Sequence, residues 1–162
     1  MDRSAYPLPH PKRNPIAWVP SVYFGMGLPY VALSLVSVIM FTDLGVEEEK
    51  VAFWTSLLVL PWSLKPLFSL CMELFGTKRR YIFLTEFITS LMFGAICFAL
   101  PLPGFFSYVV ALMGVLAISG SMHDIAGDGV YMQELTKAQQ GQYAGWQGAF
   151  YNLAKILTNG GL

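Results

Sequence analysis

Two long stretches of the chain contain no charged side chain, and they constrain its fold more than any other feature. No Asp, Glu, Lys or Arg occurs in residues 14–42 or 87–123, and the stretch 51–72 contains only Lys65. A helix needs about 20 mostly apolar residues to cross the hydrocarbon core of a bilayer. Each stretch is long enough, so the sequence predicts an all-α membrane protein surrounded by the lipid bilayer.

The overall composition excludes several classes of protein. Charged residues make up 12% of the 162 residues and hydrophobic residues 55%, whereas a soluble domain has roughly 25% charged residues. Ten basic and ten acidic side chains give no net charge, so we expect no basic face for a nucleic acid. Cys71 and Cys97 lie in apolar runs without a His or Cys at metal-ligand spacing. The sequence therefore predicts no disulfide, metal or cofactor.

Prolines, glycines and charged residues divide the apolar sequence into five predicted transmembrane helices. After a tail at residues 1–15, the predicted bundle covers residues 16–162, with helices at 16–41, 51–74, 81–100, 105–133 and 141–162. The first two helices contain internal prolines, at Pro20, Pro29, Pro61 and Pro66. Proline removes a backbone hydrogen bond and bends a helix, so these two helices are not plain membrane anchors.

The basic residues between the predicted helices indicate how the chain is oriented. Alternating the sides of the membrane places seven Lys and Arg residues on one face and one, Lys50, on the other. Cytoplasmic loops carry the excess of Lys and Arg. The sequence therefore predicts a multi-pass protein of the cell inner (plasma) membrane with a cytoplasmic N-terminal tail.

Ionisable side chains inside the predicted helices are the main functional signal, because each is costly to keep within a membrane. With a rise of about 1.5 Å per residue, Lys65 and Asp124 both lie about 13 Å deep, so they could pair. Lys155 reaches about 21 Å, near the midplane, whereas Asp128 and Glu86 are shallower.

Asp124 and Asp128 are four residues apart, which places them on one face of the fourth predicted helix. Two close carboxylates in a poor dielectric cannot both ionise cheaply, so one of them is expected to hold a proton that a transport cycle can use. The alternative is a static cluster of ion pairs that only locks helices together. His123 points about 100° away from Asp124 and is either functional or a hydrogen-bonded core histidine.

Tyrosines within the predicted helices are a further set of candidates. They are either aromatic side chains that face a substrate or packing and interface anchors. The full candidate substrate or proton pathway is Lys65, Asp124, Asp128, Lys155, His123, Tyr23, Tyr30 and Tyr151.

The sequence does not predict an enzyme. It contains no GxSxG, HExxH or phosphate-loop motif. Paired aspartates also occur in intramembrane hydrolases, but those enzymes generally place the two acids on different helices. The spacing of Asp124 and Asp128 on one helix makes this the weaker alternative.

The turn after the second predicted helix resembles the signature loop of the major facilitator superfamily, G-x-L-a-D-R-x-G-R-R. The chain reads Ser69-Leu-Cys-Met-Glu-Leu-Phe-Gly-Thr-Lys-Arg-Arg80, in which Glu73 takes the position of the Asp and Ser69 that of the first Gly. In the family this loop makes charge contacts that steady one conformation of the transport cycle. The resemblance implies a gating loop of Glu73, Gly76, Lys78, Arg79 and Arg80.

Four further stretches resemble AmpG-like permeases, a subgroup that includes muropeptide permeases and acetyl-CoA transporters. They are residues 23–30, residues 60–67, the segment His123-Asp-Ile-Ala-Gly-Asp-Gly129 and residues 150–155. Family members commonly have a basic residue where Asn152 stands, and Lys155 lies one turn later.

The resemblance implies a function and a partner for the chain. Such permeases have about twelve helices in two six-helix halves, with the substrate between the halves. The chain is therefore expected to be the N-terminal fragment of a secondary active transporter whose C-terminal half is missing, and to be unable to transport alone. The implied activity is proton symport of a muropeptide-like or other anionic small molecule. The alternative is a non-transporting helical membrane protein or an inactive fragment with a structural role.

Overall fold

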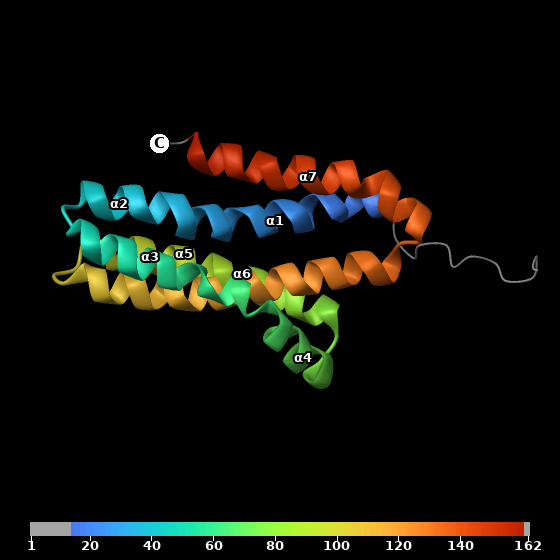
Figure 1. Ribbon diagram of the computed structural model, residues 1–162, viewed down its shortest axis with the longest axis horizontal. Helices are drawn as coiled ribbons and strands as arrows, with labels where there is room; N and C mark the ends of the chain where they lie inside the picture. Colours follow the sequence, from blue (N-terminus) through green and yellow to red (C-terminus); the bar gives the residue numbers. More distant parts are fainter. Residues whose placement is uncertain (1–13, 161–162) are drawn as a thin grey trace, which may run out of the picture.

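The described part of the chain, residues 14–160, is built from helices alone (Figure 1). In this computed structural model a short 3₁₀ turn, η1, covers Pro15–Ala17. The longer elements follow in chain order as α1 (Val19–Val31), the π-helical segment η2 (Ala32–Val36), α2 (Ser37–Asp43), α3 (Glu48–Ser63), α4 (Lys65–Phe75), α5 (Lys78–Ala99), α6 (Phe105–Glu134) and α7 (Lys137–Asn159). The predicted all-α membrane fold is confirmed, whereas residues 1–13 of the predicted tail lie outside the described residues.

The first span is one continuous rod with a π-helical segment in its middle. It runs over Pro15–Asp43, which is 29 residues long. Pro29 has no N–H to donate to the preceding turn, and the wider π turns of η2 begin three residues later. Ser34 and Ser37 donate hydroxyl hydrogen bonds to the carbonyls of Tyr30 and Leu33, at 2.7 and 2.6 Å.

The second predicted helix, residues 51–74, is two helices in the structure. α3 and α4 meet at Leu64 with a bend of 51°. Pro66 lies in the first turn of α4, where its missing N–H is tolerated, whereas within a continuous helix its ring would clash with the carbonyl of Trp62. In Figure 1, α4 points away from the other helices.

Not all of the five predicted helices have the length and composition of a membrane span. In the described residues, three helices are long and apolar enough to cross a membrane, namely Pro15–Asp43, Lys78–Ala99 and Phe105–Glu134, and the bent α3–α4 pair adds a fourth if it counts as one span. α7 falls short because its first turns are polar, with Gln139, Gln140 and Gln142.

α6 is the central helix of the bundle. It packs against α1, α3, α4 and α5, while α7 lies along α1 (Figure 1). Two clusters of buried apolar side chains fill the interior, one around Leu33, Phe41 and Val109 and the other around Tyr23, Met26 and Ala126. Polar side chains on α6 are therefore held at fixed positions relative to four neighbouring helices.

Candidate functional site

Asp124 of α6 is buried and forms an ion pair with the partly exposed Lys65 at the start of α4. Lys65 Nζ lies 3.1 Å from Asp124 Oδ2, and the indole N–H of Trp62 donates to the same oxygen at 2.9 Å. Asp124 is only 6% exposed. Its other oxygen, Oδ1, has no hydrogen-bond partner among the described residues, although a buried carboxylate oxygen is costly to leave unpaired.

The break at Leu64 brings both partners to this carboxylate. Trp62 lies in the last turn of α3 and Lys65 is the first residue of α4. On α6, the hydroxyl of Ser121 donates to the carbonyl of Pro61 at 2.9 Å. The bend between α3 and α4 and the carboxylate of Asp124 are therefore parts of one structural unit.

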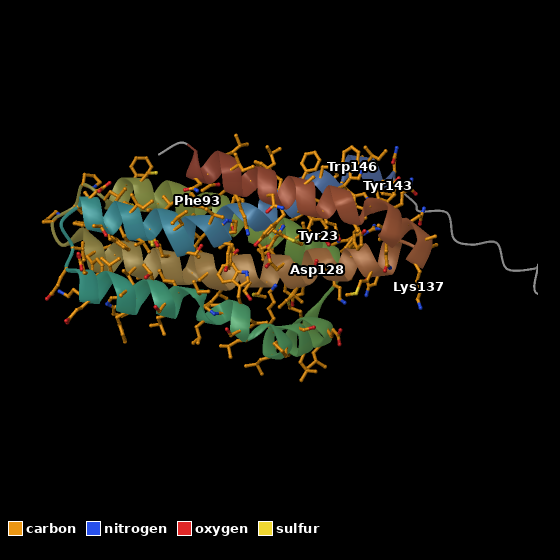
Figure 2. All side chains as sticks on the ribbon, turned by 45° about the horizontal axis from the view of Figure 1, so that its top comes forward. Tyr23, Phe93, Asp128, Lys137, Tyr143 and Trp146 are labelled. Carbon is orange, nitrogen blue, oxygen red and sulfur yellow. The ribbon has the colours of Figure 1, made fainter. Side chains whose placement is uncertain are left out.

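Asp128 lies one turn from Asp124 but has different partners and a different environment. The hydroxyl of Tyr23 on α1 donates to Asp128 Oδ1 at 2.8 Å, and the side-chain amide of Gln147 on α7 donates to the same tyrosine oxygen. Figure 2 shows Tyr23 and Asp128 close together between α1 and α6. Asp128 is exposed, whereas Asp124 is buried, so the two carboxylates do not share one environment.

The Lys65–Asp124 ion pair and the Tyr23–Asp128 hydrogen bond line the same cavity, which has a volume of about 300 Å³. A volume of this order is at the lower end of the range for small-molecule sites. Side chains from α1, α4, α6 and α7 form its wall, and they carry both acids and one basic group. The lining residues are Tyr23, Met26, Lys65, Asp124, Asp128, Gln147, Gly148 and Tyr151.

Lys155 of α7 lies against aromatic rings and not against a carboxylate. Its Nζ is 4.6 Å from the ring centre of Tyr151 and 5.8 Å from that of Tyr30, and no ion pair of Lys155 occurs in residues 14–160. An ammonium over an aromatic face is attracted by the partial negative charge on that face of the ring. Tyr30 also packs edge-on against Trp62 at 5.4 Å, which connects Lys155 to the partner of Asp124.

His123 does not line the cavity. Its Nδ1 lies 3.0 Å from the hydroxyl of Thr85 on α5, and its Nε2 lies 3.4 Å from the carbonyl oxygen of Val22 on α1. With 3% of its surface exposed, His123 is buried between α1, α5 and α6.

The residues of the expected gating loop contact both ends of the α4–α5 turn and the end of α6. Lys78 Nζ lies 3.9 Å from Glu73 Oε1, and Arg79 pairs with Glu134 at 2.7 Å. The side chain of Lys78 crosses α6 at Gly129, where an added Cβ would overlap Lys78 Cδ.

The other two residues of the expected gating loop are Gly76 and Arg80. Gly76 ends α4 beside the ring of Tyr81, which an added Cβ would approach to 3.1 Å. Arg80 is exposed and forms no ion pair within the described residues.

Among the side chains that donate hydrogen bonds in the cavity region, Trp62 and Gln147 were not predicted from the sequence. Trp62 is three residues before Lys65 and Gln147 is four residues before Tyr151, so each shares a helix face or a break with a candidate that was identified. Gln147 lies in the middle of α7, beyond the polar first turns of that helix, and this position was its signal. Trp62 carried no such signal, because tryptophan is common in apolar sequence.

The comparison with known protein families gave one result that covers most of the chain. A model of the BT1 family matches residues 25–159. No curated protein matched the chain, and no solved structure did. The matched residues include the ion pair, the cavity lining apart from Tyr23, and the α4–α5 turn.

Proposed function

The chain belongs to the BT1 family, a transporter family within the major facilitator superfamily, and from this premise we propose that its cavity binds a small molecule and a proton during secondary active transport. The proposed activity is proton-coupled uptake of an anionic metabolite, with a muropeptide-like molecule as the first candidate. We propose the cell inner membrane as its location, a cytoplasmic N-terminus, and a second six-helix half that closes the cavity.

The unequal pairing of the two carboxylate oxygens of Asp124 is the observation that carries this proposal. One oxygen of its carboxylate has two partners, while the other has none among the described residues and is buried. A buried carboxylate with a free oxygen is a group that gains from accepting a proton or a donor of a ligand. Pairing of both oxygens is what a cluster that only locks helices together would favour, so the unpaired oxygen supports a role in transport.

Lys155 supports an anionic substrate. Its ammonium is held by two tyrosine rings, which leave its charge without a carboxylate counter-ion in the described part of the chain. Tyr151 both contacts Lys155 and lines the cavity. A carboxylate or phosphate of a substrate would complete the environment of this lysine.

Uptake by proteoliposomes tests the proposal. The vesicles contain the chain together with the proposed second six-helix half. They receive labelled anhydro-muropeptide under an imposed pH gradient. Asp124→Asn keeps the shape of the side chain and removes its charge, so we expect uptake driven by the gradient to fall by at least tenfold while membrane insertion is unchanged. The matched control, Asp43→Asn, changes an exposed aspartate at the end of α2 and should transport normally.

Two outcomes contradict the proposal. Unchanged uptake and pH dependence in Asp124→Asn would remove this residue from the proton pathway. A complete absence of uptake for any anionic solute, with both halves correctly inserted, would favour the alternative of a helical membrane protein with a structural role.

A further inference from the structure

The carboxylate of Asp128 is oriented by its neighbours but has no counter-ion among them. The hydroxyl of Tyr23 donates to Asp128 Oδ1 at 2.8 Å, and this hydroxyl accepts a hydrogen bond from the amide of Gln147. The second oxygen of Asp128, Oδ2, accepts no hydrogen bond within residues 14–160, and Asp128 forms no ion pair there. Because Asp128 is exposed and lines the cavity, its carboxylate is accessible to a ligand.

The charged groups at and beside the cavity differ in whether they have a partner of opposite sign. Lys65 and Asp124 compensate each other at 3.1 Å. Lys155 has two aromatic rings beneath its ammonium and no carboxylate beside it in the described part of the chain. One negative charge, on Asp128, and one positive charge, on Lys155, are therefore left without a counter-ion among the described residues.

The helix rise gives the spacing of these two charges. On α7, Gln147 lies eight residues before Lys155, which corresponds to a rise of about 12 Å. On α1, Tyr23 contacts Asp128 and Tyr30 contacts Lys155. These tyrosines are seven residues apart, or about 10 Å along the helix. Both helices therefore give a separation of about 10 Å between the free carboxylate and the ammonium.

From this arrangement we propose that the cavity binds an elongated zwitterion, whose ammonium lies at Asp128 and whose carboxylate lies at Lys155. This inference rests on the proposed function, because it names the class of small molecule that the cavity takes. An extended chain of three amino acids spans about 10 Å, which is the separation of the two charges. A single amino acid carries the same two charges but is too short to reach both groups.

A third polar group lies between the two ends of the proposed ligand. Asp124 is four residues from Asp128 on α6, a rise of about 6 Å, and its partner Trp62 packs against Tyr30. Oδ1 of Asp124 is buried and has no hydrogen-bond partner among the described residues. An N–H in the middle of the ligand would supply this partner, and the backbone of a peptide carries such donors.

Equilibrium binding of labelled trialanine tests the proposal without a pH gradient. Lipid nanodiscs contain the chain together with the proposed second six-helix half. We expect trialanine to bind at least about tenfold more tightly than N-acetyl-trialanine, which lacks the ammonium, or trialanine amide, which lacks the carboxylate. A hydrogen bond to a charged group contributes a factor of about ten or more. Free alanine should bind at least about tenfold more weakly as well, because it cannot reach both groups.

Two substitutions assign the ends of the ligand to the two residues. Asp128→Asn should lower the affinity for trialanine by about tenfold and leave the affinity for N-acetyl-trialanine unchanged. Lys155→Gln should have the same effect on trialanine and leave the affinity for trialanine amide unchanged. The matched controls Asp43→Asn and Lys50→Gln alter exposed residues near the α2–α3 turn and should leave every affinity unchanged.

Trialanine that binds no more tightly than its blocked forms, or that does not bind, would overturn the proposal. An equal loss of affinity for free and blocked peptides in both variants would overturn it too. The comparison of free and blocked peptides uses the unmodified chain, so it decides the question even if a variant does not fold. Uptake of anhydro-muropeptide without trialanine binding would remove this inference and leave the proposed function intact. Trialanine binding without uptake driven by the pH gradient would do the reverse.

Discussion

Asp124 and Asp128 are one helical turn apart, yet their surroundings give them different properties. Asp124 is buried and ion-paired, whereas Asp128 is exposed and accepts a hydrogen bond from Tyr23. Neighbouring carboxylates in one poor dielectric would compete for a single proton. Here each has its own donors, so a proton or ligand can act on one carboxylate without first displacing the partners of the other.

Replacing Lys65 with methionine tests the strength of its ion pair with Asp124. The change leaves the Asp124 carboxylate with Trp62 as its remaining partner, so we expect the free energy of unfolding to fall by about 1–3 kcal/mol. Unfolding in mixed SDS micelles measures this loss. Adding Asp124→Asn should restore part of it, because the unpaired charge is removed.

Lys50→Met is the matched control for this experiment. Lys50 is exposed near the start of α3 and has no ion pair in the described residues, so its replacement should change the free energy of unfolding by less than about 0.5 kcal/mol. Strictly additive effects of Lys65→Met and Asp124→Asn would show that the two side chains are not coupled.

The pairing of Lys65 with Asp124 could be predicted from the sequence because depth in a helix follows from residue count. The partners of Lys155 could not be predicted, since the nearest groups are rings contributed by α1 and by its own helix. Residue count also gives no information on rotation about a helix axis relative to its neighbours. This is why the roles of Trp62 and Gln147 became visible only in the structure.

At the scale of helices, the contact between α1 and α7 depends on close approach at Gly27. A Cβ added there would lie 2.7 Å from Ala154 Cβ and 2.8 Å from the carbonyl oxygen of Tyr151. Neither atom is the end of a flexible side chain, so the helices themselves would have to move apart. Tyr23 of α1 and Tyr151 of α7 line the cavity, so their spacing depends on this contact between the two helices.

We therefore expect Gly27→Ala to lower the free energy of unfolding by about 1–3 kcal/mol, the usual cost of overpacking. Thermal unfolding in detergent provides the measurement. Gly94→Ala on α5 is the matched control, because no atom lies within 4 Å of its added Cβ, and it should be neutral or stabilising. Equal effects of the two substitutions would mean that the α1–α7 contact is not tight at Gly27.

The break between α3 and α4 shows how far element prediction from the sequence reaches. Pro61 and Pro66 indicated a bend, because each lacks a donor. The sequence did not indicate that the bend is 51° or that it lies at Leu64. Those properties depend on contacts with α6, including the bond from Ser121 to the Pro61 carbonyl.

For the whole molecule, the distribution of Lys and Arg predicts which ends of the helices face the cytoplasm. The α6–α7 turn carries Lys137, labelled in Figure 2, and the α2–α3 turn lies at the opposite end of the bundle. In a Cys71→Ser, Cys97→Ser background, we expect Glu48→Cys to react with a membrane-impermeant maleimide on intact cells. Lys137→Cys should react only after the cells are opened.

The reverse labelling pattern would show that the chain is inserted the other way round. Both positions are exposed, so a difference between them reports the side of the membrane and not burial. The all-helical architecture could be predicted because long uncharged stretches leave few alternatives. The number of spans was less certain, since α7 mixes glutamines with apolar residues.

Because α3 and α4 are separate helices that meet at Leu64, a rotation of α4 about this residue displaces its far end most. α4 has 11 residues, so its arm is about 16 Å long, and a turn of about 10° at the pivot moves its far end by about 3 Å. The ion pair with Asp124 lies beside the pivot, and Glu73 lies near the tip, where its 3.9 Å contact with Lys78 is at the limit of an ion pair. A small rotation of α4 about Leu64 would leave the Lys65–Asp124 ion pair in place. The same rotation would be enough to break the contact between Glu73 and Lys78 at the other end of α4.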